Sequence, residues 1–311
     1  MGTHWSIMKQ SWPPKAKYSV DHVPDLSGKV MIVTGANIGV GKETVKALLQ
    51  HNAKVYLAAR SPEKAKEAIQ DLKSETGKEA LFLQLDLADL NSVKRAAQEF
   101  MQKERQLHVL FNNAGVMGPP IEQLTSQGYD MTFGTNVLGP FYFTKLLLPT
   151  LIATAAAEGK PARVINTASS GAELFSQNFD YNTLKDSPAR KKMGVNVLYF
   201  QSKFGNVAFS NELFRRYGDQ GIMSCSLNPG NLRSGLQRNL SGLTKFLIEL
   251  ALYPTPYGAL TQLYAGTSTE GAKFGGKYLI PWARLTDNNP SKNAEWERTM
   301  WTWCEEQVAG L

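Results

Sequence analysis

The sequence is poor in cysteine and has no long apolar segment. Its two cysteines, Cys225 and Cys304, are too few for a disulfide framework and are expected to be reduced, buried thiols. No run reaches the roughly 18 apolar residues that suggest a membrane-spanning helix. The N-terminus lacks the apolar core of a secretory signal. Zinc-finger spacing is absent, and no metal site is expected. Because the cysteines are expected to be reduced, we expect a cytoplasmic protein.

The composition excludes several classes of protein. Hydrophobic residues make up 42% of the 311 residues and charged residues 20%, which excludes a disordered chain and a coiled coil. The net charge is +7, but the basic residues are dispersed, and the densest run is Arg190-Lys191-Lys192. Nucleic-acid binding is therefore not expected, and a phosphate-rich cofactor explains the excess positive charge equally well.

The first residues, Met1-Gly2-Thr3-His4-Trp5-Ser6, fit a short N-acylation pattern that also arises by chance. A single acyl chain would give no more than a weak membrane contact.

Strand and helix patterns alternate along most of the chain. Continuous apolar runs predict strands, with helical spacing between them and a closing helix at residues 294–308. This order predicts an α/β fold, with a parallel sheet covered by helices on both faces. We expect one domain at 28–311 after an irregular segment at 1–27. A long helix is expected at 129–157, kinked or broken at Pro149. The predicted strands are 29–34, 54–59, 79–85, 108–112, 162–168, 221–227 and 277–280.

A glycine-rich turn follows the first predicted strand. Residues 34–41 read TGANIGVG, directly before a predicted helix. Glycines allow a tight turn and a close approach of the backbone to a pyrophosphate, and the helix N-terminus adds free N–H groups. The spacing is not the common G-x-G-x-x-G, but the strand–turn–helix context supports dinucleotide binding. The cofactor-binding residues predicted here are Gly35, Asn37, Ile38, Gly39 and Gly41.

The ends of the next two strands carry further cofactor candidates. Arg60 ends the second strand, where an arginine suits the 2′-phosphate of NADP(H) and an acidic residue would suit NAD. The alternative is a solvated surface arginine. Asp86, followed by Leu87, ends the third strand and is placed to contact the adenine. Asp86 also suits a turn or a helix N-cap, and both roles can hold together.

Tyr199 and Lys203 stand four residues apart on a predicted helix, and so share one face. A nearby ammonium lowers the pKa of a phenol, which makes tyrosine a usable general acid and base. Ser169 follows the fifth strand, where its hydroxyl could hold a carbonyl oxygen, although a turn serine is common there. Asn113, Ala114 and Gly115 follow the fourth strand, and Asn136 lies inside a predicted helix.

Taken together and in order, these motifs resemble the short-chain dehydrogenase/reductase family over about residues 26–280. Within it, the chain looks most like the branch of the retinol dehydrogenases and the WW-domain-containing oxidoreductase. The features that suggest this branch are TGAN at 34–37, NNAGVMGP at 112–119 and the spacing of 30 residues between Ser169 and Tyr199.

The resemblance implies a single Rossmann-fold domain with seven strands. It implies Tyr199 as proton donor and acceptor, Ser169 as the hydroxyl that orients the substrate, and Lys203 as the residue that binds the nicotinamide ribose and lowers the pKa of Tyr199. Asn136 would anchor a water in a proton relay. The turn after the sixth strand adds cofactor contacts from Pro229, Gly230, Leu232 and Ser234, where Ser234 stands in place of the usual threonine.

Two segments lie outside a minimal scaffold of this type. They are residues 171–194 and 232–253. The second carries a stripe of apolar residues at helical spacing, which would either pack on the core or form a lid over the substrate. We predict an NADP(H)-dependent oxidoreductase that interconverts a carbonyl and an alcohol on an apolar small molecule. The alternatives are a non-catalytic NADP(H)-binding sensor and a structural scaffold. Related enzymes often pair long helices, so a homodimer is a further expectation by analogy.

Overall fold

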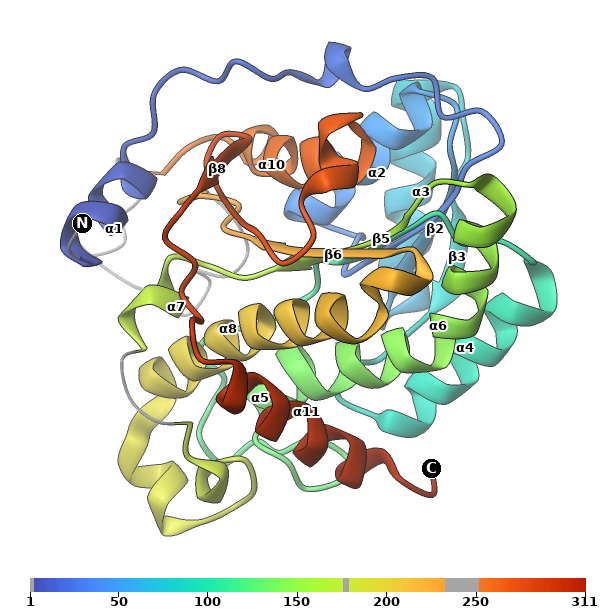
Figure 1. Cartoon of the computed structure of the whole chain (residues 1–311). Helices are drawn as coiled ribbons and strands as arrows, with labels where there is room; N and C mark the ends of the chain where they lie inside the picture. The colour runs from blue at the N-terminus through green and yellow to red at the C-terminus, as the bar shows by residue number, and fades with distance from the viewer. Residues whose placement is uncertain (1–2, 176–178, 233–251) are drawn as a thin grey trace.

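The structure, a computed structural model, describes residues 3–175, 179–232 and 252–311. Within these residues, one sheet of eight strands has the order β3-β2-β1-β4-β5-β6-β7-β8 (Figure 1). Neighbouring strands are parallel from β3 to β7, and β8 is antiparallel to β7. The strands are β1 (Val30–Thr34), β2 (Lys54–Ala59), β3 (Leu81–Gln84), β4 (Val109–Asn112), β5 (Ala162–Thr167), β6 (Ile222–Leu227), β7 (Tyr278–Ile280) and β8 (Arg284–Thr286).

Helices cover both faces of the sheet, as the apolar strands require. Val30 and Ile32 of β1 join one buried cluster, while Met31 and Val33 join the other, because successive side chains of a strand point to opposite faces. The first cluster packs against α4 (Leu90–Lys103), α6 (Gly139–Glu158), α8 (Pro188–Tyr217) and α11 (Ala294–Val308), and the second against α2 (Gly39–Gln50), α3 (Pro62–Thr76) and α10 (Thr255–Thr267) (Figure 1). The other α-helices among the described residues are short: α1 (Thr3–Ser11), α5 (Met131–Phe133) and α7 (Gly171–Leu174).

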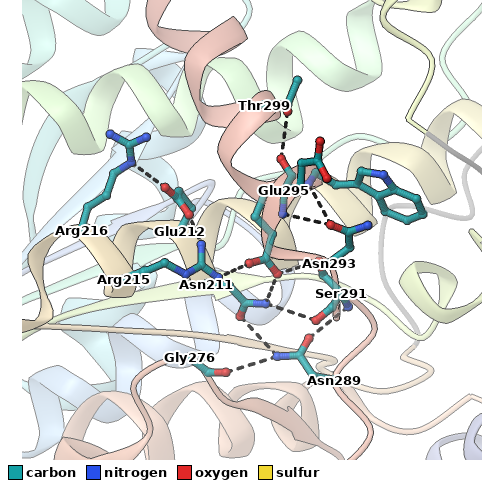
Figure 2. A network of polar contacts seen from close by, with 12 residues as sticks. Asn211, Glu212, Arg215, Arg216, Gly276, Asn289, Ser291, Asn293, Glu295 and Thr299 are labelled. Carbon is teal, nitrogen blue, oxygen red and sulfur yellow. Dashed lines mark hydrogen bonds and ion pairs between the residues drawn. The ribbon is translucent and has the colours of Figure 1, made fainter.

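A polar network joins α11 to α8, the helix that carries Tyr199 and Lys203 (Figure 2). The buried carboxylate of Glu297 accepts hydrogen bonds from Asn211 Nδ2 at 2.6 Å and Ser291 Oγ at 2.7 Å. Arg215 pairs with both Glu297 and Glu212. The two buried carboxylates therefore share a cation, as buried charges generally require.

A buried ion pair holds the start of α8. Arg190 Nε lies 2.8 Å from Asp130 Oδ2, and their side chains are 1% and 2% exposed. Arg190 also donates to the Gln123 carbonyl at 3.0 Å, and Asp130 caps α5 by accepting from Phe133 N. One residue of the basic run at 190–192 is thus an internal contact rather than part of a solvated patch.

The structure corrects the expected seven-stranded, fully parallel sheet. The eighth strand, β8, returns antiparallel after a turn in which Ala283 has a φ of 54°. Arg284 Nε donates to the Pro281 carbonyl at 2.7 Å and stabilises this reversal. The sequence of β8, Arg284-Leu285-Thr286, contains no apolar run, unlike the equally short and fully buried β7, so no strand was expected there.

The structure departs from two further expectations about helices, although a kink at Pro149 stays a prediction. Residues 3–11 form α1, so the segment 1–27 is not irregular throughout. Pro149 lies inside α6 without ending it, because the surrounding apolar residues are buried. The irregular part of the long helix is instead a π-helical turn, Gly134–Leu138, which contains Asn136. Such turns are frequent at functional sites.

Within the described residues, one helix, Met131–Glu158, is long and apolar enough to cross a membrane. However, 67% of its most apolar window is buried inside the protein, as in the core helix of a soluble domain.

The strand order places the site. It reverses between β1 and β4, since β2 lies on one side of β1 and β4 on the other. In open α/β sheets, ligands bind at the carboxyl ends of the strands where the order reverses. The glycine-rich turn follows β1, and Asn113–Gly115 follow β4, so both candidate cofactor segments lie where the strand order predicts a cofactor crevice.

Candidate active site

The glycine-rich turn is packed too closely for side chains. Gly35 has a φ of 65°, and its N–H donates to the Ala58 carbonyl at 2.8 Å. A Cβ on Gly41 would lie 2.6 Å from Asn113 Nδ2 and 2.7 Å from the Gly35 carbonyl oxygen. These contacts explain why glycine stands at both positions.

The segment after β4 is fixed against the same turn. Thr34 Oγ1 accepts hydrogen bonds from the N–H groups of Asn113 and Ala114, both at 3.0 Å. Asn113 Nδ2 donates to the Thr34 carbonyl at 2.8 Å. The candidates from β1 and β4 therefore form one rigid wall.

The N-terminus of α2 fits an anionic cofactor group. Ile38 occupies the N-cap without a side-chain hydrogen bond, and the first turn carries no acidic residue. The free N–H groups and the positive end of the helix dipole therefore point to the space above the turn. With a turn that only glycine can form, this arrangement fits a pyrophosphate.

Arg60 and Asp86 follow β2 and β3, at the carboxyl ends of these parallel strands. Arg60 is exposed and makes no ion pair with any residue in the described ranges. Asp86 Oδ1 accepts from Ala88 N at 2.9 Å, so this side chain does serve in a turn. Its neighbour Leu87 is buried in the core beneath it. The exposed guanidinium remains available for a phosphate.

Ser169, Tyr199 and Lys203 are brought together from β5 and α8. Tyr199 and Ser169 are partly exposed and share a hydrogen bond, while Lys203 is buried behind them. Lys203 Nζ lies 5.8 Å from the centre of the Tyr199 ring and donates to the Thr167 carbonyl at 3.0 Å. The two hydroxyls thus face the site, and the ammonium lies beneath them.

Asn136 and Gly115 adjoin the lysine. A Cβ on Gly115 would lie 3.2 Å from both Lys203 Nζ and Asn136 Oδ1. The Asn136 side chain accepts from Val116 N at 2.8 Å and donates to Ser202 Oγ at 2.9 Å. Asn136 therefore ties the loop after β4 to α8. Its role in a proton relay stays a prediction.

Burial dominates the ionisation of the central pair. It raises the pKa of the Tyr199 phenol, although the hydrogen bond with Ser169 opposes this shift. It also lowers the pKa of Lys203 to about 8. Burial of the phenol is thus the largest contribution to the shift of its pKa. The expectation that Lys203 lowers the pKa of Tyr199 stays a prediction.

The loop after β6 completes the described part of the site. Gly230 has a φ of 95°, and a Cβ there would lie 2.7 Å from the ring of Trp282. Pro229 is partly exposed beside it, and Leu232 is buried against α10. Ser234 and most of the expected lid segment 232–253 lie outside the described residues.

Some residues at the site carried no sequence signal. Gln262 of α10 is buried and joins Thr44 of α2 to Thr167 of β5 through hydrogen bonds. Gln10 and Glu173 meet beside the loop after β6, although 163 residues separate them. Their partners are distant in the chain, so no local pattern could have indicated them. Among the described residues, no cluster of His, Cys, Asp or Glu could hold a metal ion.

Comparisons with known proteins identify the family of this fold and site. The family model described as short chain dehydrogenase matches residues 29–185, just over half of the chain. A short-chain dehydrogenase/reductase of Armillaria gallica is 58% identical over 308 residues, with 99% of each chain covered. Another, from Neocamarosporium betae, is 40% identical over 97% of this chain and 93% of the relative.

Solved structures agree on the architecture. An uncharacterized protein from Mycobacterium paratuberculosis has a TM-score of 0.70 and 26% identity, over 94% of this chain and 97% of that one. The NADP complex of RhlG from Pseudomonas aeruginosa has a TM-score of 0.66 and 23% identity, over 88% of this chain and 98% of that one. At that identity, the second likeness concerns the fold alone.

Proposed function

Because the chain belongs to the short-chain dehydrogenase/reductase family, we propose that it is an NADP(H)-dependent oxidoreductase in which Tyr199 acts as the general acid and base. The observation that carries this proposal is the meeting of Ser169, Tyr199 and Lys203 beside Gly115. A hydroxyl, a phenol and an ammonium in one place can hold a carbonyl oxygen and move a proton to it.

When bound, the nicotinamide cofactor supplies the hydride for reduction or accepts it in oxidation. In reduction, Ser169 donates a hydrogen bond to the carbonyl oxygen and orients it. The Tyr199 phenol gives its proton to the same oxygen as negative charge develops there. Lys203 holds a positive charge beneath the resulting phenolate. In oxidation, the phenolate takes the proton of the alcohol.

The residues that would hold the cofactor lie along the crevice. The glycine-rich turn and the start of α2 suit the pyrophosphate, and Arg60 suits the 2′-phosphate of the adenosine ribose. Asp86 and Leu87 border the adenine position. Pro229 and Gly230 border the nicotinamide end, close to Ser169.

We infer that the substrate is apolar. Phe175 and Phe179 are buried and in contact, in the segment that follows Ser169. The resemblance of this segment's spacing to the retinol-dehydrogenase branch supports the same inference. The relatives compared above carry no retinoid in their names, so membership of that branch stays a hypothesis.

The experiment that tests the function follows NADPH absorbance with a panel of apolar ketones and aldehydes. The enzyme proposal requires carbonyl-dependent oxidation of NADPH. Binding of NADPH, detected by its fluorescence, without turnover of any carbonyl would favour the sensor instead. If NADPH does not bind, the remaining hypothesis is a structural scaffold.

We predict that Arg60→Ala reduces the preference for NADPH over NADH by about tenfold to a hundredfold. A guanidinium can meet a phosphate with two charge-assisted hydrogen bonds, worth roughly 1.5–3 kcal/mol. The measurement is kcat/KM for both cofactors at fixed ionic strength. Arg105→Ala is the control, because Arg105 is also exposed but precedes β4, at the amino ends of the strands and away from the cofactor site. Equal use of NADH by the wild type would refute the assignment.

The pKa shifts also predict a pH dependence. Because the pKa of Tyr199 is raised, its phenol stays protonated at neutral pH and can donate its proton. Because the pKa of Lys203 is about 8, the ammonium is progressively lost above that pH. We expect kcat for reduction to be constant near neutrality and to fall at alkaline pH, and kcat for oxidation to rise with pH. A reduction rate that climbs steadily with pH would contradict this ionisation scheme.

A further inference from the structure

The N-terminal helix α1 packs with its polar side inward. It lies beside α7, the short helix that begins two residues after Ser169 (Figure 1). Gln10 is 1% exposed, whereas Trp5 and Met8 of the same helix are 48% and 49% exposed. A surface helix normally buries its apolar side. The one buried side chain among the residues of α1 whose burial is described is therefore polar.

Gln10 joins the short helix α7 to the loop after β6. Its Nε2 donates to Glu173 Oε1 in α7, and its Oε1 accepts from Asn228 Nδ2 at 2.8 Å in the loop after β6. The amide thus uses its donor on α7 and its acceptor on the loop after β6. A side chain of nearly the same shape but without polar atoms could make neither bond.

Both partners of Gln10 are fixed to residues near the reacting atoms. Asn228 Oδ1 accepts from Gly230 N at 3.0 Å, which sets the turn at the nicotinamide end of the site. On the other side, Gly171 N at the start of α7 donates to Ser169 Oγ at 3.1 Å. A continuous path of hydrogen bonds and one short helix therefore runs from Gly230 through Gln10 to Ser169.

Glu173 is the least expected member of this path. It is buried, and burial raises the pKa of its carboxyl group. Besides Gln10, it accepts from Ser6 Oγ at 3.0 Å and from Asn288 Nδ2 at 3.0 Å. A buried carboxylate without an ion-pair partner among the described residues depends on these donors. Removing Gln10 leaves Ser6 Oγ as the one hydrogen-bond donor to Glu173 Oε1 among the described residues.

We propose that Gln10 is a positioning residue, which sets the loop of Pro229 and Gly230 relative to Ser169 by bridging Asn228 and Glu173. This inference rests on the proposed function, because it concerns the alignment of a nicotinamide with a carbonyl held by Ser169. Misplacement of reacting groups by about 1 Å can cost a hundredfold in rate. The adenosine half of the cofactor lies at the other end of the crevice and does not depend on this bridge.

The first test uses Gln10→Met, which keeps the shape of the side chain and removes both hydrogen bonds. We expect kcat for NADPH-dependent reduction of 9,10-phenanthrenequinone to fall by about tenfold or more. NADPH should bind more weakly, while adenosine 2′,5′-bisphosphate, which lacks the nicotinamide, should bind as in the wild type. The matched control is Gln98→Met, because Gln98 is an exposed glutamine on α4. A purely structural role would not separate the two nucleotides.

The second test exchanges the two groups. Gln10→Glu alone places two carboxylates together, and Glu173→Gln alone weakens the acceptor, so each should lower kcat. The double variant again offers one amide donor to one carboxylate, and Glu at position 10 can still accept from Asn228. We expect it to recover much of the lost activity. A double variant whose kcat is no higher than that of the less active single variant would contradict the bridge.

The outcomes separate this inference from the proposed function. If the wild type is active and Gln10→Met matches it in kcat and in both affinities, the positioning role alone is refuted. If the wild type binds neither nucleotide, the proposed function fails. Amide hydrogen exchange at residues 169–175 and 228–232 then tests whether Gln10 couples these two segments. Faster exchange in both segments of Gln10→Met supports the bridge, and unchanged exchange overturns it.

Discussion

Tyr199→Phe is expected to lower the rate of carbonyl reduction by about a hundredfold to ten-thousandfold, the usual contribution of a positioned general acid. The ring remains, so the packing of α8 should be preserved. Affinity for NADPH should stay nearly unchanged, because the phenol moves a proton and is not a main anchor of the cofactor. Steady-state assays measure kcat, and fluorescence titration measures the affinity for NADPH separately.

Tyr217→Phe is the matched control, since Tyr217 ends the same helix far from Ser169. Lys203→Ala makes a useful contrast. It removes a group proposed both to bind the nicotinamide ribose and to support the phenolate, and should lower kcat and NADPH affinity together. Near-normal kcat in Tyr199→Phe would show that another group donates the proton.

The buried ion pair at the start of α8 gives the largest expected effect on stability. Arg190→Met should lower the free energy of unfolding by about 3–5 kcal/mol, because it leaves the Asp130 carboxylate buried without its cation. Asp130 keeps its bond to Phe133 N, but that neutral donor cannot replace a guanidinium at 2.8 Å. Urea unfolding followed by circular dichroism measures the change.

Lys191→Met is the control for this variant, since the neighbouring Lys191 is 58% exposed and pairs only at the surface with Asp186. Exposed pairs contribute about 0–1 kcal/mol. The double variant Asp130→Asn/Arg190→Met should recover part of the loss, because no unpaired charge is then buried. A loss in Arg190→Met as small as that in Lys191→Met would mean that water reaches Asp130.

The sequence predicted the elements that depend on local patterns. Each of the seven parallel strands lies where a short apolar run predicts it, because burial on both faces demands such runs. The glycine-rich turn was also recognisable, since contacts such as that between Gly41 and Asn113 exclude every side chain. Likewise, the spacing of Tyr199 and Lys203 placed both on one face of α8.

What the sequence did not reveal depends on distant partners. Arg190 looked like part of a basic surface run, and only the fold brings Asp130 to it. Gln10 and Asn228 are 218 residues apart, and neither belongs to a pattern of buried residues. The π-helical turn at Asn136 has the apolar content of an ordinary helix, so periodicity could not distinguish it. The cytoplasmic location and the homodimer stay predictions.

The reversal at Ala283 has a consequence for the behaviour of the protein in concentrated solution. The edge strands of the described sheet, β3 and β8, contain four and three residues. A long, flat edge is a template on which strands of other molecules add and begin to aggregate. By turning back for three residues and then leaving the sheet, the chain offers such strands almost no template. Both edges of the described sheet are therefore short, which limits the pairing of strands between molecules.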